Sequence, residues 1–226
     1  MLSKNSRILI VTGHGDNDTG AISNDLIERD IVIPIGISCK NKLQKIGFTN
    51  IFLEGVDTER NGNVSYERSI AERYDLVISI HVNAYNGQAQ GFEVFCNLRN
   101  NETKKISQEI LNSMINYGFK SRGVKSGDHL AMVGKLKTNA ILVETGFIDN
   151  SHDRELINTK EKQQKIGELY AIAIANGLGV EISQSNKQGF YRVICGSYSN
   201  KLNAIDVAQR LEKFGMTGVF LEYKEV

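Results

Sequence analysis

Short apolar runs alternate along this chain with longer stretches in which apolar residues recur at helical spacing. The apolar runs have the length and character of buried strands, and they cover residues 7–12, 50–54, 75–80, 92–96 and 140–143. The helical spacing covers residues 24–46, 63–73, 101–117 and 161–176. Strands that alternate with helices are typical of the α/β class. We therefore predict a twisted, mostly parallel sheet with helices on both faces.

Local signals predict the ends of the first helix. Asn24 is expected to cap it, with Asp25 near its positive end, and Gly47 is expected to stop it. Pro34 is the only proline of the chain and predicts either a kink or the true start of this helix. Further along, the polar stretch SRGVKSGD at 121–128 is interpreted as a loop.

The composition changes after residue 179. Residues 180–188 are polar and are interpreted as a linker between a main domain at 1–179 and a small module at 189–226. The module has an alternating segment at 190–198, helical spacing at 202–214 and an apolar segment at 219–223, which predicts a β-α-β unit. A unit of this size is marginal alone, so we expect it to lean on the main domain, on a ligand or on a second copy in a homodimer.

Composition and charge narrow the class of protein. The chain has 226 residues, 41% hydrophobic residues and a formal net charge of +1, which favours a globular protein and does not favour nucleic acid as a partner. The cysteines Cys39, Cys96 and Cys195 are odd in number and scattered, which indicates reduced thiols. We find no signal-peptide pattern and no run long enough to span a membrane, so we expect no membrane partner and a cytoplasmic location until release.

Polar residues follow several of the predicted strands. His14 follows the run at 7–12, His81 follows 75–80, and Glu144 follows 140–143. Because ligands of open α/β sheets bind beyond the carboxyl ends of the strands, we expect these side chains to meet in one crevice. Glu28, on the first turns of the next helix, would complete a set of zinc ligands with His14 and His81, and Glu144 would be the general base.

Each of these residues also has a simpler interpretation. A histidine in a glycine-rich loop is often a capping or surface residue, and Glu28 alone is typical of a solvated helix position. Glu144 differs from them, because a charge at the end of an apolar run is costly unless it has a partner. Of the remaining histidines, His152 is interpreted as a surface residue at a helix start, and His129 lies in a loop that could line the crevice.

The motifs GHGDNDTGA (13–21), ISIHVNA (78–84), GFEVF (91–95) and LVETGFIDNSHDRELI (142–157), together with Glu28, resemble the zinc-dependent N-acetylmuramoyl-L-alanine amidases of the amidase-3 type. The resemblance covers residues 7–178. It implies one Zn²⁺ per catalytic domain, held by His14, Glu28 and His81, with Glu144 as the catalytic acid and base. It also implies hydrolysis of the amide between N-acetylmuramic acid and L-alanine, so the expected partner is peptidoglycan, through its glycan strand and stem peptide.

The chain departs from the family pattern at several positions. Asp18-Thr19-Gly20-Ala21 stands where the family shows D-P-G-A, Glu54-Gly55 replaces a Thr-Arg pair, and Ala71-Glu72 replaces Ala-Asn after Arg68. These positions shape the groove or the fold, so they bear on substrate preference more than on the reaction.

The segment from Phe190 to Leu221 is similar to half of a SPOR-type module, which implies binding to glycan strands; the plain alternative is a packing appendix. A glycan-binding module would raise the effective concentration of the enzyme at the wall.

Several functional alternatives fit the same residues. A phage endolysin is the expected biological role, because we find no export signal, and a sporulation autolysin that acts on the mother cell is the alternative with the same chemistry. A zinc carboxypeptidase or deacetylase would act on another wall bond. A non-catalytic peptidoglycan-binding protein would keep the fold without the reaction.

Overall fold

The computed structural model describes residues 1–15, 17–58, 64–182 and 198–214. The chain divides into two compact units, Met1–Ser183 and Gln184–Val226. In the second unit, helix α6 (Lys201–Lys213) begins where the Asn200 side chain accepts a hydrogen bond from the Leu202 amide, and it matches the helix predicted at 202–214. The strands predicted on either side of α6, and most of the predicted linker, fall outside the described residues.

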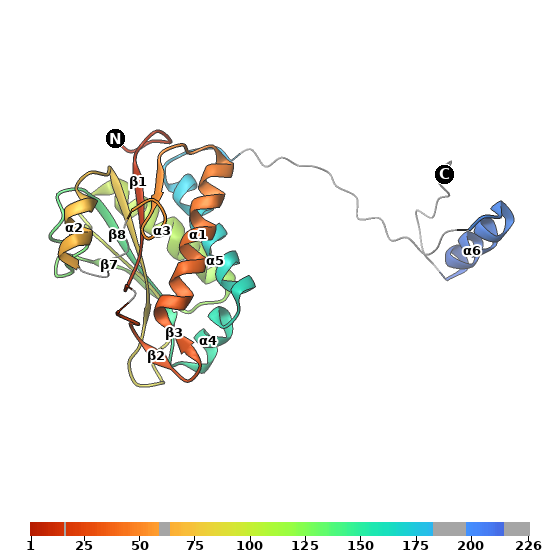
Figure 1. The fold of residues 1–226 in the computed structure, drawn as a ribbon. Helices are drawn as coiled ribbons and strands as arrows, with labels where there is room; N and C mark the ends of the chain where they lie inside the picture. The colour runs from red at the N-terminus through yellow and green to blue at the C-terminus, as the bar shows by residue number, and fades with distance from the viewer. Residues whose placement is uncertain (16, 59–63, 183–197, 215–226) are drawn as a thin grey trace. The chain divides into compact units, whose positions relative to one another are not determined.

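The first unit is built on a six-stranded sheet with the order β4-β1-β5-β8-β6-β7 (Figure 1). Its strands are β1 (Ile8–Thr12), β4 (Ile51–Leu53), β5 (Leu76–Asn83), β6 (Phe92–Cys96), β7 (Ser121–Ser126) and β8 (Asn139–Phe147). The first four strands in the spatial order are parallel, β6 is antiparallel to β8, and β7 is parallel to β6. This mixed, mostly parallel sheet confirms the predicted α/β class.

Helices pack on both faces of the sheet, as predicted. On one face, α1 (Glu28–Ile46), α3 (Asn101–Tyr117) and α5 (Lys160–Gly177) bury the larger core, which includes Ile10, Ile78 and Val143 from the central strands. On the other face, α2 (Val64–Ala71) covers Leu9, Val11 and Val77 in a smaller cluster. Figure 1 shows α1 and α5 side by side on one side of the sheet and α2 on the other. The second face is therefore the less covered one.

The first helix begins later than predicted. Asn24 adopts φ 52° and lies in the turn of a small hairpin between β2 (Ile22–Ser23) and β3 (Leu26–Ile27), which the sequence analysis missed. A short turn favours asparagine at positive φ, so Asn24 serves the hairpin and caps no helix. Helix α1 starts at Glu28, whose amide donates to the carbonyl of Ala21 (2.9 Å), and it continues through Pro34 to the stop at Gly47.

Two further segments differ from the sequence interpretation. Residues 121–126, expected to be a loop, form the edge strand β7. An edge strand is held by backbone pairing with one neighbour, so it needs no apolar run, and the polar sequence hid it. A short helix, α4 (Ser151–Ile157), was also missed, and it is capped by the side chain of Asn150. Across the described part of the chain, no helix is both long and apolar enough to cross a membrane.

Close packing of α1 against α5 depends on Gly167. A Cβ atom at this position would lie 2.3 Å from the Ile35 carbonyl oxygen and 2.9 Å from the Cys39 nitrogen, both of which are backbone atoms that cannot turn aside. We predict that Gly167→Ala lowers the free energy of unfolding by about 1–3 kcal/mol, because the helices must separate to admit the methyl group. Urea unfolding followed by circular dichroism measures the effect. Lys165→Ala, on the exposed side of α5, is the control and should change stability little; equal stability of the two variants would contradict this account of the packing.

Candidate metal and catalytic site

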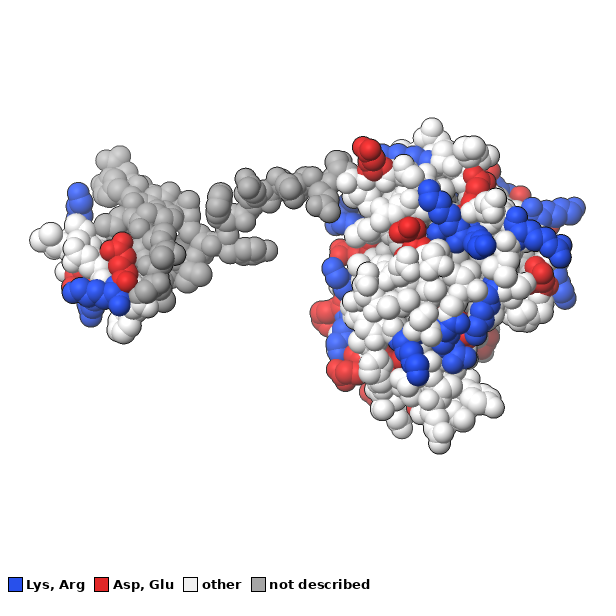
Figure 2. All heavy atoms as spheres, turned by 180° about the vertical axis from the view of Figure 1, so that it is seen from behind, with Lys and Arg blue, Asp and Glu red and all other residues white. Residues whose placement is uncertain are grey.

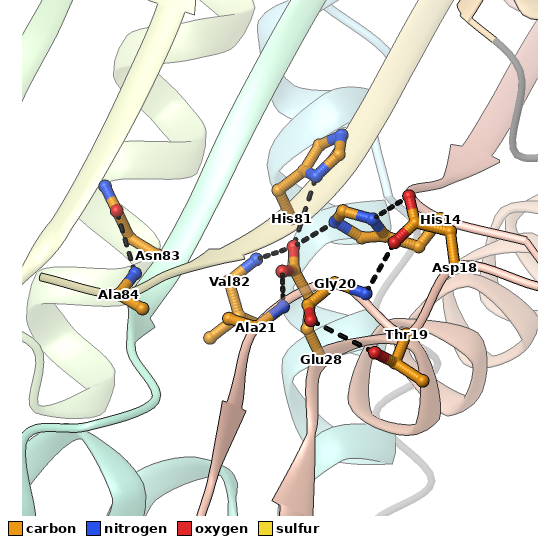
Figure 3. Close-up of polar contacts among 10 residues, drawn as sticks. All are labelled: His14, Asp18, Thr19, Gly20, Ala21, Glu28, His81, Val82, Asn83 and Ala84. Atoms are coloured by element: carbon orange, nitrogen blue, oxygen red, sulfur yellow. Dashed lines mark hydrogen bonds and ion pairs between the residues drawn. The ribbon is translucent and has the colours of Figure 1, made fainter.

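Three side chains from different elements meet where β1 ends beside β5. His14 follows β1, Glu28 is the first residue of α1, and His81 lies in β5. Nε2 of His14 lies 3.1 Å from Oε1 of Glu28, and Nδ1 of His81 lies 3.2 Å from the same oxygen (Figure 3). The two imidazole rings stand nearly perpendicular, with centroids 5.2 Å apart. The residues predicted to bind zinc are thus brought together.

The backbone around these residues explains how they come so close. His14 adopts a left-handed φ of 70°, which is uncommon for a residue with a side chain and is typical of functional sites. The amide of Gly13 donates to the Ile80 carbonyl (3.0 Å), which ties this loop to β5. A Cβ on Gly13 would lie 2.2 Å from the His81 ring, so the approach of the two histidines requires glycine at this position.

Glu28 is held from several sides. Its side chain is 5% exposed, and its Oε1 accepts a hydrogen bond from the Val82 amide (2.9 Å). Its Oε2 accepts one from the Ala21 amide (2.9 Å). Burial opposes the charge on this carboxylate, but the hydrogen bonds from His14 and His81 outweigh it and hold the pKa of Glu28 well below its usual range. The carboxylate is therefore ionised and fixed in orientation.

The pKa values of the two histidines are shifted in the opposite direction to that of Glu28. The hydrogen bond to Glu28 raises the pKa of His14 to about 9, against the opposing effect of burial. For His81, burial lowers the pKa and the hydrogen bond to Glu28 raises it, with a net rise. The electrostatics of the cluster therefore favour positive charge beside the buried carboxylate.

The donor set and its spacing fit a zinc ion. Two imidazole nitrogens and one carboxylate oxygen can be chosen so that all lie within 4.8 Å of one another. Tetrahedral zinc with bonds of about 2.0–2.2 Å to such ligands needs donors only about 3.3–3.6 Å apart, so small side-chain adjustments suffice. Three protein ligands leave a fourth position open, as catalytic zinc sites require.

Asp18 supports this set and was not identified from the sequence. Its Oδ2 lies 2.9 Å from Nδ1 of His14, on the side of the ring away from Glu28 (Figure 3). A carboxylate behind a histidine fixes the ring orientation and leaves the other nitrogen to face the metal. The signal was present in the sequence, because Asp18 lies in the same glycine-rich loop as His14.

Glu144 lies directly beside His81. The two residues are Cα partners across the parallel strands β5 and β8, so their side chains project from the same face of the sheet. Burial raises the pKa of Glu144 to about 7. Among the described residues, its Oε2 is buried and has no hydrogen-bond partner. A carboxyl group in this state can take up or release a proton near neutral pH.

The position of the site within the sheet differs from the prediction in one respect. The polar residues were expected just after the strands, but His81 lies inside β5 and Glu144 lies inside β8. Strand pairing involves only the backbone, so both strands continue past these residues and direct their side chains onto the sheet face. The site therefore combines His14, beyond the carboxyl end of β1, with His81 and Glu144 on the sheet face.

The other histidines lie outside the three-ligand cluster. His129 is exposed and packs edge-on against Phe95, with ring centroids 6.0 Å apart. His152 is exposed in the first turn of α4, as predicted.

Glu93 is a buried carboxylate that was predicted only as part of a strand. A charge within the apolar run FEVFC is the same signal that identified Glu144.

Known proteins resemble this chain over the whole first unit. The chain is 30% identical to the endolysin of Bacillus phage SPP1 over 75% of its own length and 65% of that protein. It is 27% identical to a sporulation-specific N-acetylmuramoyl-L-alanine amidase of Bacillus subtilis over 95% of its own length and 84% of that protein. The fold is similar to the crystal structure of an N-acetylmuramoyl-L-alanine amidase from Clostridium difficile 630, with a TM-score of 0.70 and 22% identity over 78% of this chain and 98% of that one.

A family match supports the same assignment. Residues 8–176, which include the four residues singled out from the sequence, match the amidase-3 family, described as N-acetylmuramoyl-L-alanine amidase. This range contains the complete sheet and the helices α1 to α5. The chain therefore belongs to the amidase-3 family of N-acetylmuramoyl-L-alanine amidases.

Proposed function

We propose that this protein is a zinc-dependent hydrolase of the amide bond between N-acetylmuramic acid and the L-alanine of the peptidoglycan stem peptide. The observation that carries the proposal is the His14–Glu28–His81 cluster with Glu144 beside it on the next strand. The ligands of this cluster fit zinc, and the family to which the chain belongs indicates the class of substrate. A chain that retains all four groups is poorly explained as a non-catalytic wall-binding protein.

The residues divide the chemistry between them. Zinc held by His14, Glu28 and His81 supplies Lewis-acid polarisation of the substrate carbonyl and lowers the pKa of water at the site to about 7. Asp18 keeps the His14 ring in the orientation that presents Nε2. Glu144 accepts the proton of the attacking water and delivers it to the departing alanine nitrogen, so it acts first as a base and then as an acid.

The main test identifies the new chain ends after digestion of purified cell wall. Mass spectrometry and amine labelling should find free L-alanine amino groups, and a chelator should abolish their release until zinc is added back. Glu144→Gln should keep stoichiometric zinc and lose about 100-fold or more of the rate, because the amide cannot transfer the proton. His81→Ala should lose the zinc itself.

One control variant and two contrary outcomes make this test decisive. Glu161→Gln removes a charge from an exposed position on α5, away from the cluster, and should retain full activity. Free acetate or free D-amino acids as the new products would instead identify a deacetylase or a carboxypeptidase. Near-normal release of L-alanine amines by Glu144→Gln would refute the role of that carboxyl group.

Zinc binding is predicted to depend on pH through His14. The pKa of this ring is about 9 in the metal-free protein, above its usual value, so the ring carries a proton at pH 7 that zinc must displace. Binding at pH 7 should therefore release about one proton or more, and affinity should rise with pH until about pH 9. Calorimetry in buffers of different ionisation enthalpy measures the release; no proton release would contradict the assignment of His14 as a ligand.

We also propose that the protein serves as a phage endolysin, retained in the cytoplasm and acting on the wall after release. The similarity to the SPP1 endolysin supports this role. This chain also matches the sporulation-specific amidase of Bacillus subtilis over 95% of its own length. That similarity supports a sporulation autolysin as the second role.

A turbidity assay separates the two roles. An endolysin should clear suspensions of vegetative walls rapidly, while a sporulation enzyme should act preferentially on walls isolated late in sporulation. The Glu144→Gln variant is the blank for both substrates. A clear preference for sporulation-stage walls would overturn the endolysin role while leaving the reaction intact.

A further inference from the structure

A second buried carboxylate lies next to Glu144, on the side away from His81. Glu93 on β6 is the Cα partner of Glu144 across the antiparallel pair β6–β8. Directly opposed residues of paired strands project from the same face, so His81, Glu144 and Glu93 form a row across three adjacent strands. Side chains that bind Glu93 therefore lie close to Glu144 and His81.

Glu93 holds two basic side chains from the edge strand β7. Nε of Arg122 lies 2.9 Å and Nζ of Lys125 lies 2.5 Å from the same oxygen, Oε2. The other oxygen accepts a hydrogen bond from Nδ2 of Asn83 (3.1 Å). The Glu93 side chain is 5% exposed, whereas Arg122 and Lys125 are 34% and 39% exposed. One carboxylate beneath two cations leaves a positive charge that faces solvent.

The two cations are also positioned by aromatic rings. The guanidinium of Arg122 lies over Phe147, 4.9 Å from the ring centroid, and the ammonium of Lys125 lies 5.8 Å from the centroid of Phe95. These contacts restrict long side chains that would otherwise be free to move. The pair is therefore partly preorganised, which lowers the entropic cost of binding an anion.

A hollow of about 430 Å³ opens over this pair. Its lining contains basic and neutral residues and no acidic one, namely Gln88, Ala89, Gln90, Lys120, Ser121, Arg122 and Lys125. By contrast, the chain as a whole has a net charge of +1, and Figure 2 shows basic and acidic side chains mixed over the face that it draws. The positive character of the hollow is therefore local.

We propose that Arg122 and Lys125 form an anion subsite that binds a carboxylate of the stem peptide during hydrolysis. The inference rests on the proposed amidase function and names how the peptide side of the substrate is recognised. The glycan offers hydroxyl and acetamido groups, and the lactyl carboxyl group of muramic acid is consumed in the scissile amide. The remaining carboxylates are those of the peptide, and they suit a guanidinium and an ammonium.

The spacing limits which residue of the peptide is bound. Adjacent strands lie about 4.8 Å apart, so β7 lies roughly 10 Å from the backbone of Glu144, and its two cations reach back toward Glu93. An extended peptide advances about 3.3 Å per residue, so the distance corresponds to one to three residues. The bound carboxylate therefore belongs to one of the first residues after the scissile bond.

The test compares two soluble N-acetylmuramoyl peptides that differ only in whether the peptide carboxylates are free or amidated. The zinc-loaded wild type should cleave the free acid with kcat/KM about tenfold or more above the amide, mainly through KM. Lys125→Met should reduce this preference several-fold. Arg122→Lys, which keeps the charge and loses the planar fork, should reduce it less. Lys105→Met, an exposed lysine on α3, is the matched control and should leave the preference unchanged.

A variant of Glu93 separates substrate binding from a purely structural role. If the cations bind substrate, Glu93→Gln removes a competing carboxylate and should raise the preference for the free acid. If they serve only to neutralise Glu93, Lys125→Met should slow both peptides equally, and adding Glu93→Gln should restore the rate. That result, or equal cleavage of both peptides by the wild type, would overturn the subsite. Failure of the wild type to cleave either peptide would instead refute the amidase function.

Discussion

The geometry of this site depends on one buried carboxylate. Glu28 accepts hydrogen bonds from two backbone amides and lies against both histidines, so it joins the loop after β1, the start of α1 and the strand β5. Burying a charge in this way is unfavourable unless it is compensated. The contacts of Glu28 with the rings of His14 and His81 provide the compensation. The same contacts fix the orientation of all three side chains.

Much of this arrangement was predictable from the sequence. The apolar runs identified the central strands, and their polar neighbours identified His14, His81 and Glu144, because a charged or ligating group at a buried strand requires a function or a partner. The place of Glu28 on the first turns of the following helix, and the resemblance to a known family, added this residue. The physical basis is general, since parallel strands bring residues that are distant in sequence to the same part of one sheet.

Other features could not be predicted from the sequence. Strand β7 has a polar sequence, and only its pairing with β6 makes it a strand. The role of Asn24 depends on a hairpin of very short strands that has no apolar pattern of its own. The partnership of Glu93 with Arg122 and Lys125 depends on the antiparallel register of β6, and local patterns carry no information about register between distant strands.

The row formed by His81, Glu144 and Glu93 is set by strand register, and the connecting segments take no part in it. The segment 84–91 joins β5 to β6 and the segment 127–138 joins β7 to β8, and neither contributes to the ladder. The alignment of the three side chains in this row is therefore set by the sheet itself. In such a design the connecting segments can change in length or sequence while the register that aligns the row stays fixed.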